Sequence, residues 1–294
     1  MARRAGAHLW WRTSWLLLAC ALPAGAAFEF TGRGARSTAL GGAFAARVRA
    51  AEAVWYNPAG NARQKHWRAG STHALLYPVL DRSPTLNGLA VAGPLKGGGV
   101  QAGLSFLAAD GWREEVLALG YGRALNDRLA LGGGLRASAW KAGDLSHRAW
   151  SLDLGGTWEV GFVHPLVYLR VGMAARGLNG ANFAAGGQAA GEDPRSVVLA
   201  ASISMAGREL LIDLERRDGR SELRAGYETR TVSLNGARFR VGGAALGSNL
   251  ADGELNVGLG HDWKDWNFDY AYSYPLQVTG MGGTHRFSVG YRRR

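Results

Sequence analysis

Apolar and polar side chains alternate along most of the chain, from Trp67 to Arg294, in segments that turn residues separate. The segment NFDYAYSY (267–274) places its phenylalanine and three tyrosines on one face, and Asn, Asp, Ala and Ser on the other. A period of two predicts β-strands whose two faces meet different surroundings. The second face is too polar for the core of a soluble sandwich. The pattern therefore predicts a membrane-spanning β-barrel with an apolar outside and a polar lumen.

The alternating segments number about fourteen, an even count of the kind that bacterial barrels have, and a count of about twelve stays open. The predicted strands are 67–77, 85–95, 99–108, 113–124, 128–141, 147–159, 165–176, 195–206, 208–217, 221–231, 237–245, 253–263, 265–274 and 284–293. The predicted tight connections are 96–98, 126–127, 207 and 264, and the predicted long ones are 78–84, 177–194, 246–252 and 275–283. Short turns at one end and longer loops at the other are typical of barrels. We therefore expect an all-β fold, a transmembrane antiparallel up-and-down barrel over residues 67–294.

The two faces of the predicted strands have consistent chemistry. The predicted lipid-facing side chains include Leu117, Leu119, Tyr121, Trp150, Leu152, Leu154, Trp158, Leu210, Ile212, Leu214, Phe287, Val289 and Tyr291. The predicted lumenal charges are Asp213, Glu215, Arg217, Glu222, Arg224, Glu228 and Arg230. Such charges either guide a substrate or pair across strands and brace the wall, and we favour bracing because unpaired buried charges are costly.

The N-terminus has the features of a Sec signal peptide over residues 1–27. Arg3, Arg4 and Arg12 precede an apolar run, and small residues follow it, so cleavage is expected near Ala26 or Ala27. Cleavage there removes Cys20, the only cysteine. The alternative is a lipoprotein site at Cys20, which the preceding leucine and the short apolar run fit poorly.

Residues 28–66 differ from the rest of the chain, because small residues dominate them and the alternation disappears. One short helix is expected around Ala43–Ala53. The turn Asn57-Pro58-Ala59-Gly60 then ends any helix and leads to the first strand. We interpret this segment as a plug within the lumen, and its turn as either a hinge or a locally satisfied bend.

The sequence GARSTALGGAF (34–44), followed by AVWYNPAG (53–60), resembles the N-terminal signature of the PorV/PorQ family, which is related to the FadL outer-membrane transporters. The C-terminal FDYAYSYP and GGTHRFSVGYR also resemble the last two strands of that family. The resemblance implies a fourteen-stranded barrel with a lumenal N-terminal segment. It implies passage of hydrophobic molecules if the chain is FadL-like, or a role as a secretion-system partner if it is PorV-like. The C-terminal Arg292-Arg293-Arg294 and the short chain depart from both patterns.

Chemical motifs for other functions are weak. Ser146-His147 and His285…Ser288 are the nearest Ser/His candidates, but adjacency does not provide hydrogen-bond geometry, and an odd spacing puts side chains on opposite strand faces. The histidines are dispersed and the acidic residues lack EF-hand spacing, so we expect no enzyme, no cofactor and no metal site. The formal net charge is +11, but the arginines are scattered, which favours contact with anionic outer-membrane lipid or lipopolysaccharide over nucleic acid.

The expected function is that of an outer-membrane channel for hydrophobic or small molecules, and the alternative is a non-catalytic partner of secretion-system components. Phe44, Trp55 and Tyr56 are the candidate ligand-lining residues of the plug. The same aromatic side chains could instead seal the lumen. The sequence does not identify the substrate.

Overall fold

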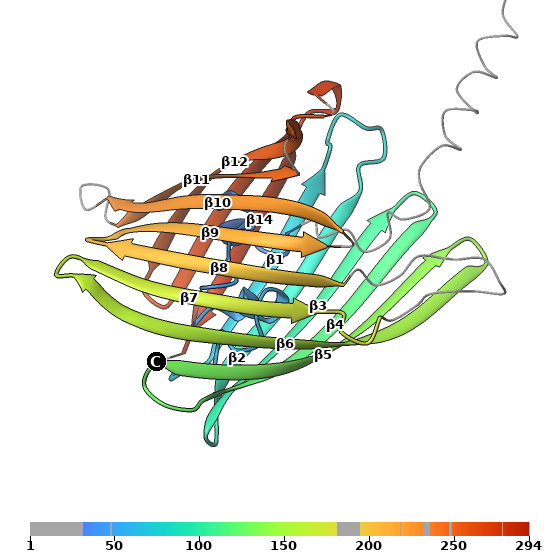
Figure 1. Ribbon diagram of the computed structural model, residues 1–294. Coiled ribbons are helices and arrows are strands. Elements are labelled where there is room, and N and C mark those ends of the chain that lie inside the picture. Colours follow the sequence, from blue (N-terminus) through green and yellow to red (C-terminus); the bar gives the residue numbers. More distant parts are fainter. Residues whose placement is uncertain are drawn as a thin grey trace, which may run out of the picture.

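Fourteen antiparallel strands close into one barrel, shown in Figure 1. The computed structural model describes residues 32–47, 49–180, 195–217, 219–231, 236–246, 249–277 and 279–293. The predicted signal peptide, the cleavage site, the first residues of the predicted plug and most of the 177–194 connection lie outside these residues. Closure occurs where β1 pairs with β14 on one side and with β2 on the other.

Every predicted strand has a counterpart in the barrel. The bounds are β1 Arg68–Leu76, β2 Thr85–Leu95, β3 Gly98–Ala109, β4 Trp112–Ala124, β5 Leu129–Ala142, β6 Leu145–His164, β7 Val167–Arg176, β8 Ser196–Met205, β9 Arg208–Arg217, β10 Arg220–Thr231, β11 Ala237–Leu246, β12 Asn249–Trp263, β13 Trp266–Pro275 and β14 Thr284–Arg292. The fold class and the strand count predicted from the sequence are therefore confirmed. A short 3₁₀ helix, η3 (Thr279–Met281), lies between β13 and β14.

One predicted connection is wrong. Residues 246–252 were expected to form a long loop, but β12 begins at Asn249. A register shift between Ala244 and Leu246 lets Leu246 pair with Asn249, so the ladder continues into a stretch rich in turn residues. Pairing satisfies backbone groups that a loop would leave to water.

The two ends of the barrel differ. The turn end carries the tight hairpins, such as those at 165–166 and 264–265, together with the start of β1 and the end of β14. The loop end carries the longer connections, including 77–84 between β1 and β2. These two names are kept below.

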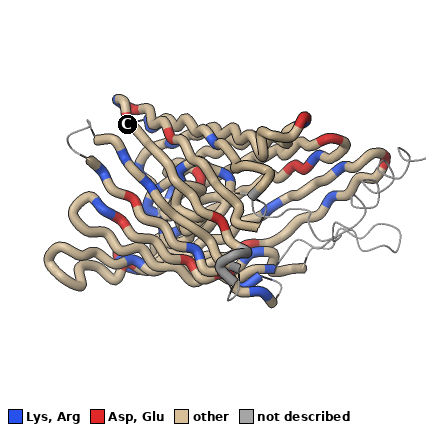
Figure 2. The backbone as a smooth tube through the Cα atoms, turned by 90° about the horizontal axis from the view of Figure 1, so that it is seen from above, with Lys and Arg blue, Asp and Glu red and all other residues tan. Residues whose placement is uncertain are grey.

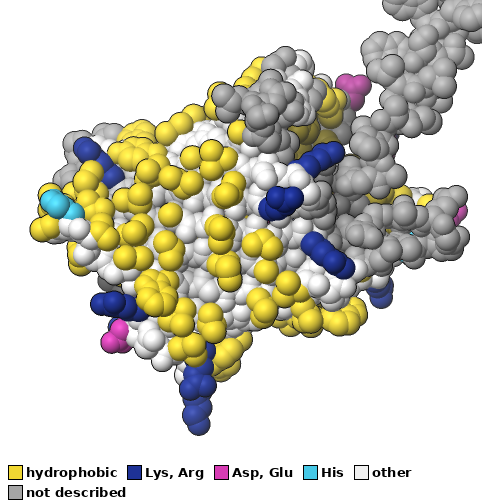
Figure 3. All heavy atoms as spheres, viewed as in Figure 1, with side chains coloured by type: hydrophobic (Ala, Val, Ile, Leu, Met, Phe, Trp, Pro, Cys, Tyr) yellow, Lys and Arg dark blue, Asp and Glu magenta, His cyan; other side chains and the backbone are white. Residues whose placement is uncertain are grey.

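The outward face of the barrel is apolar. All thirteen side chains predicted to face lipid are exposed large hydrophobic groups, from Leu117 on β4 to Tyr291 on β14. In Figure 3, hydrophobic side chains cover most of the visible wall, and the few Lys and Arg side chains lie toward its margins. So large an exposed apolar surface marks a wall that contacts lipid. None of the helices in the described part of the chain is long and apolar enough to cross a membrane.

Residues 32–66, called the lumenal segment below, lie inside the barrel. They contain one α-helix, α2 (Ala35–Ala39), and one 3₁₀ helix, η1 (Ala51–Trp55). The helix expected around residues 43–53 is wrong. The backbone N–H groups of Phe44 and Ala45 donate to the carboxylate of Asp213 instead of to helical carbonyls, and Arg49 has a positive φ of 60° that interrupts any helix.

The wall admits this segment because many inward positions are glycine. A Cβ atom at Gly132 on β5 would lie 2.5 Å from the backbone of Pro58. On β10 and β11, Gly226 and Gly242 likewise face the backbone of Leu40. Backbone of the lumenal segment therefore packs directly on backbone of the wall, and this is a position-specific use of glycine rather than general flexibility.

Candidate functional site: the lumenal segment and the seam above it

The turn at residues 57–60 is fastened to the wall as well as closed locally. The Asn57 side chain accepts a hydrogen bond from the Ala59 backbone N–H (2.9 Å), which closes the turn. Its amide nitrogen donates to the carbonyl oxygens of Ala45 (2.8 Å) and of Gly156 on β6 (3.1 Å). Asn57 is fully buried. The sequence predicted the bend, and the structure adds an anchor between two parts of the lumenal segment and β6.

A second polar anchor lies on β3. The Asn61 amide donates to the side-chain oxygen of Gln101 (2.7 Å), and the Gln101 amide donates to the carbonyl oxygen of Pro58 (2.9 Å). Both residues are buried. The end of the turn is thus held against β3 by side chains that the polar, inward face of this strand supplies.

The predicted lumenal charges form ion pairs around two carboxylates. Glu215 on β9 is fully buried and binds Arg176 (2.6 Å), Arg217 (2.9 Å) and Arg224 (2.6 Å). Arg224 also binds Glu222 (2.7 Å). In Figure 2, acidic and basic positions are interspersed along the strands of this wall. The predicted bracing role is supported by this geometry.

The second carboxylate ties the lumenal segment to the wall. Glu228 on β10 binds Arg36 (2.6 Å) and Arg47 (3.3 Å) of the lumenal segment, and Arg240 (2.6 Å) of β11. Arg47 also pairs with Glu209 on β9. Two elements far apart in sequence are therefore joined by charge-assisted hydrogen bonds in a buried place.

Asp213 has a different role from its neighbours. Its carboxylate accepts the backbone N–H groups of Phe44 and Ala45, both at 2.9 Å. It thereby replaces the carbonyl partners that these groups lack outside a helix. Arg230, the last member of the predicted network, is exposed and makes no ion pair within the described residues, so the structure does not bring it together with the other members. Arg230 lies next to the last residue of β10, at the turn end of the barrel and beyond the lumenal segment.

Phe44, Trp55 and Tyr56 lie together, as the sequence suggested. Phe44 and Tyr56 have ring centroids 5.0 Å apart, and the Arg33 guanidinium lies 4.9 Å from the Trp55 ring. All three aromatic residues are buried and pack with Val116 and Leu211 of the wall. Burial raises the pKa of Tyr56 to about 12, so its phenol is neutral. Their role in lining a ligand stays a prediction, because packing closes this region.

An aromatic shelf, formed by Trp112, Trp140 and His147, lies above the lumenal segment at the loop end. The rings of Trp112 and Trp140 stack with centroids 5.0 Å apart and an interplanar angle of 9°. The His147 ring lies 4.9 Å from Trp140. The Trp140 Nε1–H is buried without a hydrogen-bond partner in the described structure. The shelf therefore presents an apolar face and one available donor.

Apolar side chains join the shelf to the lumenal segment. Val116 and Ala118, the inward positions of β4 that follow Glu114, form one hydrophobic cluster with Trp140, Trp55 and Phe44, and Trp112 packs against it. We call this cluster, with Trp112, the apolar seam. The charged network occupies β7 to β13, whereas the seam follows β4 and β5. The lumen is thus richer in ion pairs along β7 to β13 and richer in apolar side chains beside β4 and β5, where Glu114 and the Arg136–Asp153 pair also face inward.

The sequence interpretation missed the shelf, although a signal was present. Trp140 shares its strand face with Ser138 and Arg136, and Trp112 shares its face with Glu114. A tryptophan on the polar, lumenal face of a strand departs from the barrel pattern and marks a candidate binding position.

The fold and the filled lumen define a class of protein, the closed fourteen-strand barrels with an N-terminal segment in the lumen. Similar solved structures include the toluene transporter TbuX of Ralstonia pickettii (14% identity, 91% of this chain and 99% of that chain, TM-score 0.61). They also include the toluene transporter TodX of Pseudomonas putida (11% identity, 90% and 98%, TM-score 0.56) and the monoaromatic hydrocarbon channel CymD (14% identity, 91% and 98%, TM-score 0.59).

At these identities the similarity shows the fold alone. No family model and no curated protein matches the sequence. The shared architecture agrees with the FadL-like barrel that the sequence resemblance implied, while the PorV/PorQ likeness stays a prediction.

Exchange of Gly132 for alanine is expected to loosen the lumenal segment, because the new Cβ would meet the Pro58 backbone at 2.5 Å. Gly133→Ala is the matched control: its Cβ points outward and lies 3.9 Å from a Leu154 methyl group. Limited proteolysis of the folded barrel in detergent measures the effect. We expect faster cleavage within residues 32–66 in the Gly132 variant only. Equal cleavage of both variants would contradict direct backbone packing at this position.

Proposed function

We propose that the protein is an outer-membrane channel that admits small hydrophobic molecules into its lumen, without catalysis. The apolar outer wall supports a membrane location, and bacterial barrels place short turns on the periplasmic side and longer loops outside. By that rule the loop end faces the exterior. Export by a Sec signal peptide, cleaved near Ala26 or Ala27, belongs to the same proposal.

The observation that carries the proposal is the apolar seam. A ligand site is usually a mostly apolar concavity with few polar groups. Here the stacked Trp112 and Trp140 stand at the loop end, and Val116 and Ala118 lead from them to Trp55 and Phe44. A hydrophobic molecule that enters from outside would meet an aromatic surface first and stay in apolar contact down to the lumenal segment.

The passage is closed where the seam meets the lumenal segment. Phe44, Trp55 and Tyr56 are each at most 5% exposed, so a molecule cannot pass them without a displacement of the segment. The contacts that hold the lumenal segment differ in kind from one part of it to another, and this difference bears on such a displacement. Ion pairs to Glu228 and hydrogen bonds to Asp213 hold residues 36–47 to the β9–β11 wall. Beside the seam, uncharged hydrogen bonds to Gly156 and Gln101 hold residues 57–61, and the aromatic residues pack by apolar contact.

The similar structures support the same class of cargo. TbuX is a toluene transporter and CymD is a monoaromatic hydrocarbon channel. Two stacked indoles offer flat surfaces to a ring of that kind, and aromatic pairs contribute about 0.5–1.5 kcal/mol beyond the burial of area. We therefore propose small, flat apolar compounds as the preferred cargo, with the Trp140 Nε1–H as a donor for a single polar substituent.

Exchange of Trp140 for alanine is expected to weaken the binding of a labelled monoaromatic compound by about 1–3 kcal/mol, since one large apolar contact is lost. The measurement is equilibrium dialysis with the purified barrel in a neutral detergent. Trp150→Ala is the matched control, because Trp150 lies on the neighbouring strand β6 but is outward and 57% exposed. Equal binding by both variants and the unaltered protein would place the ligand away from the seam.

A further inference from the structure

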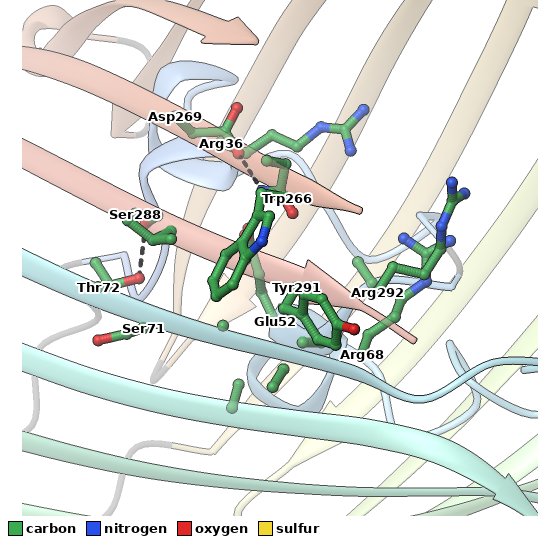
Figure 4. A pocket seen from close by; sticks show the side chains of 18 of the residues that line it. Arg36, Glu52, Arg68, Ser71, Thr72, Trp266, Asp269, Ser288, Tyr291 and Arg292 are labelled. Atoms are coloured by element: carbon green, nitrogen blue, oxygen red, sulfur yellow. Dashed lines mark hydrogen bonds between the residues drawn. The ribbon is translucent and has the colours of Figure 1, made fainter. Parts of the chain in front are cut away.

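The turn end of the lumen holds a cavity of about 330 Å³ that the apolar seam does not reach, shown in Figure 4. Eight basic and four acidic side chains line it, contributed by the lumenal segment and by strands around the point of closure. The lining is therefore strongly cationic. None of the functions proposed above accounts for this excess.

Two of the four acidic groups in the lining are held in ion pairs, and a third, Asp265, has an interaction partner as well. Asp262 binds Arg238, and Asp269 binds Arg240 (2.7 Å), which lies outside the lining. Glu52 makes no ion pair in the described part of the chain, and burial, together with the nearby Asp269, raises its pKa. A raised pKa reduces the negative charge that Glu52 brings. The acids of the cavity therefore leave part of the positive charge without a counter-ion.

Three of the lining arginines contribute to that charge. Arg36 and Arg47 are held by Glu228, but Arg49, Arg68 and Arg292 make no ion pair among the described residues. Arg49 sits in the lumenal segment with its backbone N–H donating to the Gly60 carbonyl oxygen (3.0 Å). Arg68 and Arg292 lie on the two strands that close the barrel.

Arg68 and Arg292 are direct cross-strand partners in the β1–β14 ladder. Both occupy inward positions, and Figure 4 shows their side chains extending from the two strands into the same region. Like charges directly opposite each other destabilise a sheet. The Arg68 Nε–H is also buried and lacks a hydrogen-bond partner in the described structure. An opposed pair of arginines with an unused buried donor is the arrangement that an anion would complete.

We propose that this cavity binds a small oxyanion, a carboxylate or phosphate group, between Arg68 and Arg292, with Arg49 as a third cationic contact. Planar guanidinium groups bind carboxylate and phosphate oxygens in pairs, and these charge-assisted hydrogen bonds are among the strongest in proteins. The bound anion would neutralise the repulsion between the two strands that close the barrel. The site lies apart from the seam, so its test does not depend on channel activity.

The group could belong to a free anion of the surrounding solution or to a phospholipid headgroup at the rim. In both cases the recognised chemistry is the same. The distinction is made by presenting inorganic phosphate to the barrel in a neutral detergent without phosphate groups or in nanodiscs of phosphatidylcholine with phosphatidylglycerol. A free-anion site responds to phosphate equally in both media, whereas a headgroup site responds only in the detergent, because lipid phosphate already fills it in the nanodisc.

The test uses the full chain and the double variant Arg68→Gln/Arg292→Gln, with Arg82→Gln as the control. Arg82 is an exposed loop-end arginine that pairs with Asp110. The readouts are phosphate binding by calorimetry and the unfolding midpoint in phosphate against chloride at equal ionic strength. We expect saturable binding by the unaltered protein and by the control. The double variant should bind phosphate at least about tenfold more weakly.

A second readout separates a binding role from a merely structural one. Without phosphate, the double variant should unfold at a midpoint equal to or above that of the unaltered protein, because repulsion has been removed. With phosphate, the unaltered protein should gain stability by ligand linkage and the variant should not. The proposal is overturned if the unaltered protein shows no saturable response in the detergent or in the nanodiscs, or if the double variant keeps full phosphate affinity.

Discussion

Exchange of Glu215 for glutamine is expected to lower the free energy of unfolding of the barrel by about 3–5 kcal/mol. Glu215 is fully buried, and its carboxylate contacts Arg176, Arg217 and Arg224 at 2.6 to 2.9 Å. Glutamine keeps the shape but removes the charge. Arg176 and Arg224 are also buried and would retain too little negative charge around them, and that deficit, more than the loss of one attraction, makes the effect large.

Urea unfolding in a neutral detergent measures the change in the free energy of unfolding from the midpoint and slope of the transition. The shift between folded and unfolded bands on gels follows the transition. Asp110→Asn is the control, since Asp110 also pairs with an arginine, Arg82, but both side chains are more than two-thirds exposed. Exposed pairs contribute about 0–1 kcal/mol, so the control should unfold close to the unaltered protein. Similar midpoints for both variants would show that the charged wall does not brace the barrel.

A disulfide between the lumenal segment and the wall is expected to abolish uptake of hydrophobic compounds. Ala39 on α2 and Ala271 on β13 are both fully buried in one small hydrophobic cluster, so the double variant Ala39→Cys/Ala271→Cys brings two thiols into the same buried place. A disulfide forms between two such thiols when their Cβ atoms lie about 3.5–4.5 Å apart. The chain's one natural cysteine, Cys20, lies in the predicted signal peptide and offers no competing thiol after cleavage.

Cells that express the oxidised double variant should take up a labelled monoaromatic compound no faster than cells without the barrel. A thiol reductant should restore uptake. The single variant Ala271→Cys is the control and should transport in both conditions. Undiminished uptake with the disulfide demonstrated on a gel would show that molecules pass without movement of α2.

The strands were predictable because two environments act on every residue of the wall. Lipid outside and a polar lumen inside impose a period of two, and the segments 85–95 and 208–217 coincide with β2 and β9. The end of β6 was harder to predict from the sequence. Its turn-end half, from 160 to 164, alternates weakly, and two register shifts against β7 hide the period there. Pairing with a neighbouring strand decided this region more than the local pattern did.

The lumenal segment was harder to predict because long-range partners decide its conformation. An Ala-rich stretch favours helix locally, yet the carboxylate of Asp213, about 170 positions further along the chain, captures the N–H groups of Phe44 and Ala45. The same limit hid Arg36 and Arg47 as partners of Glu228. Alternation predicts that a charged side chain of a strand faces the lumen. It does not predict which residue of the lumenal segment that side chain contacts.

The aromatic positions show the opposite case, in which local information was sufficient. Phe44, Trp55 and Tyr56 stood out in a small-residue segment and do cluster in the lumen. Trp112 and Trp140 stood out equally, as bulky apolar groups on polar faces. Residues of this kind can be found from the sequence by looking, on each strand, for side chains whose polarity differs from that of the other residues on the same face.

Uptake of a labelled monoaromatic hydrocarbon by cells of a Gram-negative host, with and without the folded barrel in the outer membrane, tests the central claim most directly. We predict faster, saturable uptake in the cells that carry the barrel, reduced by an excess of unlabelled compound. Equal uptake in both kinds of cell, with the folded barrel demonstrated in the outer membrane, would contradict a channel for such molecules.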